Sequence, residues 1–141
     1  MVDDQALIRE AFEAKENAYV PYSAFMVGAA LLTKSGKVYR GCNIESAAYS
    51  PTNCAERTAF FKAVSEGERE FAAIAVTGAR KDAEPRDYGW AYPCGVCRQV
   101  MMEFCDPDAF RIIVARTPGE YQAHTLRDLL PNGFGPANLA L

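Results

Sequence analysis

The chain has little of what several common functions require. It contains one histidine, His124, and its apolar runs fall far short of the roughly 20 residues that span a bilayer. Basic residues number 15 against 18 acidic ones, and the net charge of −3 gives no field that would attract a phosphate backbone. These absences argue against a membrane or a nucleic-acid polymer as partner and favour a small neutral or polar ligand.

The length and composition fit one folding unit. At 141 residues and 50% hydrophobic, the chain is long enough for one buried core and too short for two ordinary domains, so we expect a single domain over residues 1–141. The acidic start, Met-Val-Asp-Asp-Gln, lacks the basic and then apolar pattern of a signal peptide, which predicts a cytoplasmic protein. In that compartment the five cysteines are expected to be reduced, buried or metal-bound.

Hydrophobic periodicity and turn residues predict interleaved helices and strands. Leu7, Ala11, Ala14 and Ala18 recur at helical spacing within a helix over 3–19, which Pro21 closes. We expect further helices over 54–65 and 94–104, a short helix or turn over 124–130, and strands over 25–32, 38–43, 71–77 and 110–115. The second strand mixes polar and apolar residues and suits a less central place. This order indicates a mixed α/β domain.

Three cysteines fall at the starts of two predicted helices. Cys94 and Cys97 are three apart, so at a helix start they share one face, and Cys54 begins another helix and can complete a three-sulfur shell. Helix N-termini carry about half a positive charge, which lowers the pKa of a thiol toward the thiolate that a metal requires. Soft thiolates favour zinc, and three protein ligands with one open position are typical of a catalytic zinc.

Two charged residues follow the first of these cysteines. Glu56 lies in the same helical turn as Cys54 and can take and pass on the proton of a zinc-bound water. Arg57 can donate hydrogen bonds to the sulfurs and offset the negative charge of three thiolates around one Zn²⁺. A Cys-x-x-Cys pair is also typical of a structural zinc knuckle or a redox pair, and a glutamate in a first helical turn often only complements the helix dipole.

A closed structural zinc site would need a fourth protein ligand. The remaining candidates are Cys42, Cys105 and His124. We expect both cysteines to be small buried apolar side chains and the histidine to be a surface or cap residue. The site is therefore predicted to keep one position open for water.

Two short segments carry a known signature. Cys54-Ala-Glu56 and Pro93-Cys94-Gly-Val-Cys97 resemble the motifs of zinc nucleoside deaminases in their three-cysteine form. The resemblance covers nearly the whole chain and is to the small homotetrameric cytidine deaminases. Its other segments are Pro21-Tyr-Ser-Ala-Phe25-Met-Val27-Gly-Ala-Ala-Leu-Leu, Gly41-Cys-Asn43-Ile-Glu45-Ser-Ala47-Ala-Tyr49, Cys94-Gly-Val-Cys-Arg-Gln and Leu129-Leu-Pro-Asn-Gly-Phe134-Gly-Pro.

The resemblance implies a fold and an activity. The fold is a three-layer α/β/α sandwich with a central mixed five-stranded sheet, and the cofactor is one Zn²⁺ per subunit. The activity is hydrolytic deamination of cytidine and deoxycytidine to uridine and deoxyuridine plus ammonia, in pyrimidine salvage. The water is activated by zinc, and Glu56 shuttles the protons.

The resemblance also assigns roles to further residues. It implies that Asn43 and Glu45 hold the ribose hydroxyls. It also implies that Phe25 and Val27 pack against the pyrimidine, and that the backbone of Ala55 reads the base edge together with Glu56. It further implies a homotetramer with shared active sites. The positions that approach a neighbour's ligand are Ala47, Tyr49 and Phe134.

The chain departs from the family pattern just before the cysteine pair. The family commonly has serine before Pro-Cys and alanine between the cysteines, whereas this chain has Tyr92 and Val96, preceded by Tyr88-Gly-Trp90-Ala91. A Tyr92 ring turned into the pocket would change the set of accepted bases. Two alternatives stay open: a deaminase of a modified nucleoside or an aminonucleoside antibiotic of the blasticidin S type, and a non-catalytic zinc-stabilised oligomer. The acidic charge disfavours an editor of polynucleotides.

Overall fold

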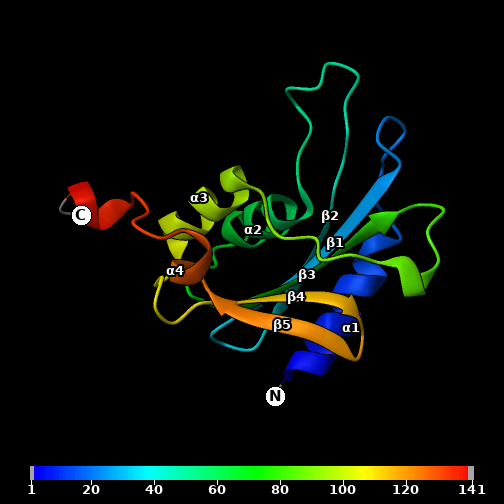
Figure 1. Ribbon diagram of the computed structural model, residues 1–141. Helices are drawn as coiled ribbons and strands as arrows, with labels where there is room; N and C mark the ends of the chain where they lie inside the picture. The colour runs from blue at the N-terminus through cyan, green and yellow to red at the C-terminus, as the bar shows by residue number, and fades with distance from the viewer. Residues whose placement is uncertain (1, 140–141) are drawn as a thin grey trace.

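One five-stranded sheet with helices on both faces forms the fold (Figure 1). The computed structural model describes residues 2–139. The elements in chain order are α1 (Asp4–Lys15), β1 (Phe25–Thr33), β2 (Val38–Cys42), α2 (Ala55–Ser65), β3 (Phe71–Arg80), α3 (Gly95–Phe104), β4 (Arg111–Thr117), β5 (Glu120–Thr125) and α4 (Leu126–Leu129), with 3₁₀ turns at Pro85–Asp87 and Pro136–Leu139. Among the residues described, no helix is both long and apolar enough to cross a membrane.

The sheet is mixed, as the resemblance implies. Its order is β2-β1-β3-β4-β5; β3 and β4 pair in parallel, and all other neighbours pair antiparallel. The predicted mixed five-stranded sheet is therefore confirmed. β2 lies at one edge, in agreement with the mixed composition that predicted a less central place for it.

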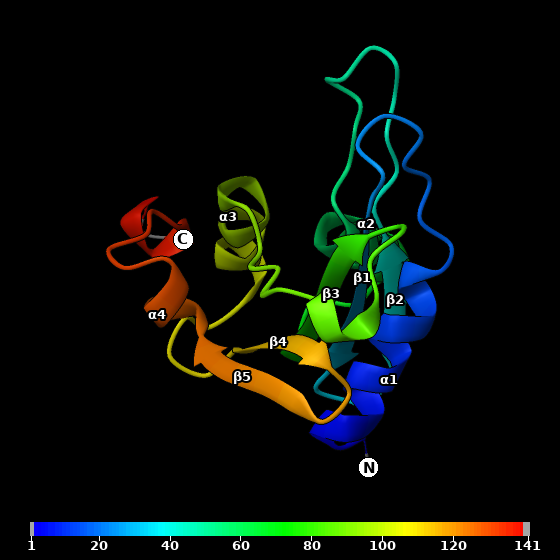
Figure 2. The ribbon, with the colours of Figure 1, turned by 45° about the vertical axis from the view of Figure 1, so that its right-hand side comes forward.

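Alternate residues of the central strands supply two hydrophobic cores, one on each face of the sheet. Ile112 and Val114 of β4 pack with residues of α2 and α3, whereas Ile113 and Ala115 of the same strand pack with α1. Figure 2 shows α1 on the side of the sheet away from α3. Helix, sheet and helix thus form the three layers of an α/β sandwich.

The first helix ends earlier than its apolar spacing predicts. Asp3 is its N-cap and accepts a hydrogen bond from the backbone N–H of Ala6 at 2.8 Å. The helix stops at Lys15 instead of continuing to residue 19. The reason is tertiary: the backbone of Tyr19 pairs with Ile44 in a parallel bridge, and its N–H donates to the carbonyl of Asn43 at 3.0 Å.

Periodicity missed the fifth strand altogether. β5 lies at the other edge of the sheet, pairs only with β4, and has mostly exposed or half-exposed residues. Such a strand has no buried face to give it an alternating pattern. Thr125 ends β5 and caps α4 through a capping box with Asp128, so the predicted short helix begins two residues after residue 124.

Two glycines let the helices approach β1 and β2 at backbone distance. A Cβ placed on Gly28 of β1 would lie 2.1 Å from the carbonyl oxygen of Ala11 and 2.5 Å from the backbone nitrogen of Lys15, both in α1. A Cβ placed on Gly41 of β2 would lie 2.3 Å from the carbonyl oxygen of Ala55 in α2. Backbone atoms cannot move aside as a flexible side chain can, so these contacts require glycine.

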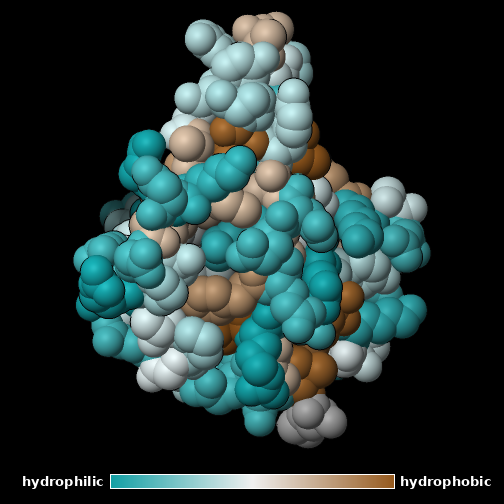
Figure 3. Space-filling model, turned by 90° about the vertical axis from the view of Figure 1, so that its right-hand side faces the viewer, coloured by the Kyte–Doolittle hydropathy of each residue, from teal (hydrophilic) through white to brown (hydrophobic). Residues whose placement is uncertain are grey.

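Residues 43–53 form an arm that projects from the body of the molecule (Figure 1). The arm joins β2 to α2, and its base is fastened by the antiparallel bridge between Ile44 and Asn53. Glu45 is its only charged residue. Figure 3 shows that the projecting part lacks the strongly hydrophilic colouring that covers much of the rest of that face.

We expect Gly28→Ala to destabilise the fold by about 3 kcal/mol or more, because the added methyl group overlaps the backbone of α1. The measurement is urea-induced unfolding. Gly119→Ala is the matched control, since a Cβ at Gly119 meets nothing within 4 Å and no positive φ is found there. Equal unfolding midpoints for the two variants would show that α1 does not lie against β1 as described.

Candidate active site

Three cysteine thiols meet where two helices begin. Cys54 is the N-cap of α2, Cys94 is the N-cap of α3, and Cys97 lies in the first turn of α3. Their sulfur atoms all lie within 4.8 Å of one another, and the sulfurs of Cys54 and Cys94 are 3.6 Å apart. We call these residues the thiol cluster. In the part of the chain that the structure describes, no other group of three Cys, His, Asp or Glu side chains is placed to hold a metal ion.

The thiol cluster favours the thiolate form at Cys54. A hydrogen bond from the Cys97 thiol, followed by smaller contributions from Arg57 and Cys94, lowers the pKa of Cys54 to about 5. The same hydrogen bond, together with burial, raises the pKa of Cys97, which keeps its proton until a metal displaces it. Neither N-cap sulfur caps its own helix. Both are therefore available as ligands.

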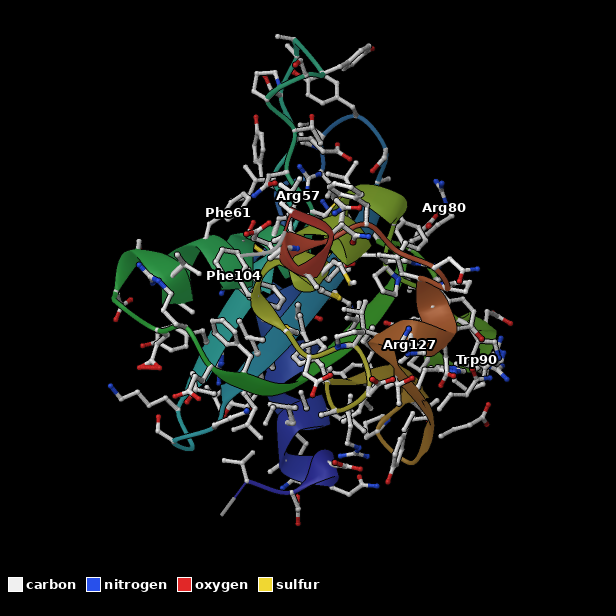
Figure 4. The ribbon with its side chains drawn as sticks, turned by 90° about the vertical axis from the view of Figure 1, so that its left-hand side faces the viewer. Arg57, Phe61, Arg80, Trp90, Phe104 and Arg127 are labelled. Carbon is white, nitrogen blue, oxygen red and sulfur yellow. The ribbon has the colours of Figure 1, made fainter. Side chains whose placement is uncertain are left out.

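Arg57 supplies the positive charge beside the sulfurs. Its Nη2 donates to the sulfur of Cys54 at 3.3 Å. Burial lowers the pKa of Arg57, but the hydrogen bonds to Cys54 and Cys97 outweigh burial and raise it, so the guanidinium stays charged. Its Nε is buried and has no hydrogen-bond partner among the described residues. Figure 4 shows Arg57 near the base of the arm.

Glu56 is a buried carboxyl group in the first turn of α2. It is 4% exposed, and burial raises its pKa from 4.5 to about 7, with the nearby Cys54 thiolate adding to the rise. An isolated buried carboxylate is costly, so this group is poised to hold a proton near neutral pH. A raised pKa in a cleft beside a specific charge makes Glu56 a candidate functional residue.

The donor set fits zinc. Three thiolates within a few ångströms of each other match the soft, tetrahedral preference of Zn²⁺, and three protein ligands leave the fourth position to a small molecule. The candidates for a fourth protein ligand lie elsewhere: Cys105 is buried behind α3, Cys42 is half-buried at the end of β2, and His124 is half-buried in β5 beside Gln122. The expectation that these three stay out of the metal site agrees with this placement.

A cavity of about 360 Å³ lies next to the thiol cluster. We call it the zinc pocket. The sheet forms its floor, the start of α2 forms one wall, and the segment that leads into α3 forms the opposite wall. Its lining residues are Phe25, Val27, Asn43, Cys54, Ala55, Glu56, Val76, Trp90, Ala91, Tyr92 and Cys94. Sequence reasoning missed Val76, whose place in a buried strand gives no sign of a ligand contact.

Hydrogen bonds fix Asn43 to the start of β1 and Glu45 to the segment just before it. The Asn43 side chain accepts from the N–H of Val27 at 2.9 Å and donates to the carbonyl of Phe25 at 2.8 Å. Glu45 accepts from the N–H groups of Tyr22 and Ser23 at 3.0 and 3.1 Å and from the Ser23 hydroxyl, which together lower its pKa. Asn43 thus lines the zinc pocket, while Glu45 lies beside it in the arm.

Three of the sequence-predicted residues lie away from the zinc pocket of their own chain. Ala47 and Tyr49 are at the outer part of the arm, and Phe134 is in the C-terminal segment 126–139. Tyr49 is 73% exposed and Phe134 is 57% exposed.

Two residues that sequence reasoning missed hold the C-terminal segment on α3. Arg98 donates to the carbonyl of Pro93 at 2.7 Å and to the carbonyl of Leu129 at 2.5 Å. Gln99 donates to the carbonyl of Phe134 at 2.8 Å. The contacts to Leu129 and Phe134 join segments that are distant in the sequence, so no local pattern indicates them.

The Tyr92 side chain is anchored on β5. Its hydroxyl donates to Gln122 at 2.6 Å, and its ring meets His124 edge-on with centroids 6.0 Å apart. The ring therefore lines the rim of the zinc pocket and does not fill it. The departure from serine at this position leaves the interior of the pocket open.

A mixed sheet whose facing helices present three thiolates beside a buried carboxyl group defines a zinc-dependent hydrolytic enzyme. The family model for the cytidine and deoxycytidylate deaminase zinc-binding region matches residues 1–113. The chain belongs to this deaminase family. The expected zinc cofactor is thus confirmed by the family and by the thiol cluster.

Curated relatives match over almost the full chain. A cytidine deaminase of Halalkalibacterium halodurans is 53% identical over 133 residues, 94% of this chain and 95% of the relative. A cytidine deaminase of Sporosarcina psychrophila is 50% identical, over 99% of this chain and 96% of the relative. The crystal structure of cytidine deaminase from Burkholderia pseudomallei superposes with a TM-score of 0.84 at 47% identity, covering 94% of this chain and 99% of that one. These matches confirm the predicted fold class.

We expect Cys97→Ser to lower bound zinc from about one ion per chain to a small fraction, because a serine hydroxyl does not ionise to replace a thiolate. The measurement is metal analysis of purified protein by mass spectrometry. Cys42→Ser is the matched control, since Cys42 lies outside the thiol cluster. Full zinc content in the Cys97 variant would exclude that residue as a ligand.

Proposed function

We propose that this chain deaminates cytidine and deoxycytidine by hydrolysis, giving uridine or deoxyuridine and ammonia. The observation that supports the proposal is the pairing of a buried Glu56 with the thiol cluster in a pocket of nucleoside size. The relatives named as cytidine deaminases favour the same substrate. We propose pyrimidine salvage in the cytoplasm as the setting of this reaction.

The residues Cys54, Cys94 and Cys97 would hold the metal. Bound there, zinc supplies a Lewis acid that lowers the pKa of water toward about 7. Arg57 offsets part of the thiolate charge through its hydrogen bond to Cys54 and thereby keeps that water acidic.

Glu56 carries the protons in this proposal. It takes a proton from the attacking water and gives it to N3 of the cytosine, so that C4 becomes tetrahedral. It then takes the proton of the new C4 hydroxyl and delivers it to the exocyclic amine, so that the C4–N bond breaks, ammonia leaves and C4 becomes the carbonyl carbon of uridine. A group that must both accept and donate works best with a pKa near the working pH, and burial raises the pKa of Glu56 to about 7.

The rest of the zinc pocket orients the nucleoside. Phe25 and Val27 provide an apolar surface for the pyrimidine, and the backbone N–H of Ala55 reads the base edge. Asn43 and Glu45 hold the ribose hydroxyls. The hydrogen bonds of Asn43 to β1 and of Glu45 to the segment before β1 hold these side chains in place before the substrate arrives, which reduces the entropy lost on binding.

We propose that the active unit is a homotetramer with shared sites, each chain contributing one domain. The exposed Tyr49 and Phe134 and the weakly polar arm then cover a neighbour's zinc pocket. Gln99 fixes the backbone of Phe134, so the C-terminal segment is presented in one position.

The alternatives differ in support. A deaminase of a modified nucleoside is favoured by Trp90 and Tyr92, which form one wall of the pocket. A non-catalytic zinc-stabilised oligomer gives no reason to bury Glu56 with a pKa near 7 at that site.

We expect Glu56→Gln to keep its zinc and to lose turnover of cytidine by about 100- to 10,000-fold, because the amide cannot shuttle protons. Ammonia release and the ultraviolet change from cytidine to uridine measure the rate. Glu103→Gln, on the exposed part of α3, is the matched control. A Glu56 variant with near-native turnover would remove the proton shuttle from the mechanism.

We expect Phe134→Ala to lower kcat/KM for cytidine by about tenfold, which corresponds to the loss of roughly 1.4 kcal/mol of contact. We expect activity to recover when this variant is mixed with the Glu56→Gln variant. In a mixed tetramer, an intact Phe134 from a Glu56→Gln chain can complete a site whose own Glu56 is native. The two variants are refolded together at equal amounts. Activity above the mean of the two separate preparations supports shared sites, and activity equal to that mean contradicts them.

A further inference from the structure

A second cavity adjoins the zinc pocket. It has a volume of about 520 Å³ and lies between the end of β3 and the loop of residues 81–91. We call it the loop cavity. It shares three residues with the zinc pocket, Phe25, Trp90 and Ala91, which form the neck between the two spaces. The proposed reaction does not use this volume.

Gly78 lies directly against two of the residues that form the neck. A Cβ on this residue would lie 2.9 Å from the Cβ of Ala91 and 3.0 Å from Cε1 of Phe25. Any side chain at position 78 would thus fill the floor of the neck. Glycine at 78 therefore lets the side chains of Phe25 and Ala91 lie against β3.

The wall that carries Trp90 is held in place from beneath. The guanidinium carbon of Arg116 lies 5.4 Å from the centroid of the Trp90 ring. The Nε of Arg116 also donates a hydrogen bond to the carbonyl of Tyr88 at 2.8 Å. The Tyr88 ring stacks on Phe12 of α1 with centroids 6.5 Å apart, and its hydroxyl accepts from Lys15. Alternate aromatic residues of the loop are therefore fastened to different elements, and the loop cavity is preformed.

The sheet order shows which edge of the substrate faces the neck. α2 packs on β2 and β1, which puts Glu56 on that side of the zinc pocket. Trp90 rests on β4 and Tyr92 on β5, which puts their segment on the opposite side. In a cytosine ring, N3 and C5 flank C4. With C4 at the thiol cluster and N3 at Glu56, C5 points toward the neck.

We propose that the loop cavity is a subsite for a substituent on C5 of the base, so that this chain deaminates cytidines whose C5 substituent is longer than a methyl group. The inference rests on the proposed function, which fixes the orientation of the ring. The lining combines small and aromatic side chains with three exposed charged residues, Arg80, Asp82 and Asp87, and Arg80 and Asp82 form an ion pair at 3.5 Å. Figure 4 shows Arg80 and Trp90 on the same side of the molecule, apart from Arg57. A slender, uncharged substituent fits this surface.

The test compares cytidine, 5-methylcytidine and 5-propynylcytidine as substrates of the zinc-loaded protein. The propynyl group is rigid and linear, so it must pass the neck if the ring binds as proposed. We expect kcat/KM for 5-propynylcytidine to lie within about tenfold of that for cytidine. A kcat/KM about 100-fold or more below that of cytidine would overturn the proposal, because it would show that the neck rejects the substituent.

The variant Ala83→Leu tests whether the C5 substituent occupies the loop cavity. Ala83 lines that cavity and not the zinc pocket. Filling it should lower kcat/KM for 5-propynylcytidine by about tenfold or more and change the values for cytidine and 5-methylcytidine by less than about twofold. Ala109→Leu, at an exposed residue outside both cavities, is the matched control, and Ala83→Val is the smaller replacement if the leucine variant does not fold. An equal loss for all three substrates would overturn the subsite.

Fluorescence separates this proposal from the proposed function. Trp90 is the only tryptophan in the chain and lies at the neck. If cytidine is not turned over, the proposed function fails, and titration with 5-propynyluridine and uridine then tests the subsite by binding alone. A larger change of Trp90 emission with the propynyl compound, lost in Ala83→Leu, supports the subsite. Equal changes for both compounds, or none, overturn it.

Discussion

The structure depends on two helices that begin face to face. Cys54 and Cys94 occupy the N-cap positions of α2 and α3, where serine, threonine or aspartate would each stabilise a helix by about 1 kcal/mol. Neither sulfur caps its helix, so both helices forgo that contribution. In exchange, the sulfurs and the positive ends of two helices meet at one point, which is the arrangement that stabilises thiolates and then a cation between them.

Charges near this point are coupled. Raising the pKa of Glu56 from 4.5 to about 7 corresponds to about 3 kcal/mol of differential interaction between its protonated and ionised forms. The rise comes first from burial and then from the Cys54 thiolate, whose own pKa is lowered through Cys97 and Arg57. The site therefore holds one acid that readily loses its proton and one that retains it, two residues apart on the same helix. This difference is what a site for general acid–base chemistry requires.

The sequence predicted the metal-binding and acid–base residues better than it predicted the ends of the elements and the contacts between them. The thiol spacing, the start of each helix and the position of Glu56 are local features, and residues close in sequence fix them. The strand β5, the early end of α1 and the clamps from Arg98 and Gln99 depend on contacts between distant segments, for which single-sequence patterns carry no signal. The zinc pocket lies between these cases: Phe25 and Asn43 were found by resemblance, whereas Val76 looked like any buried strand residue. The ring direction of Tyr92 required the structure, because Gln122 is 30 residues away.

The close approach of α2 to β2 at Gly41 affects how the active site responds to substitutions in the hydrophobic cores. The carbonyl of Ala55, between Cys54 and Glu56, lies against the backbone of Gly41 in β2. A contact between the main chains of α2 and β2 therefore positions the start of α2. Substitutions that alter side-chain volume in the cores move helices through side-chain contacts. They do not alter the contact between the backbones of Gly41 and Ala55. Core residues outside the pocket lining can therefore change while the start of α2 keeps its distance from β2, and Gly41, like Gly28, does not accept a side chain.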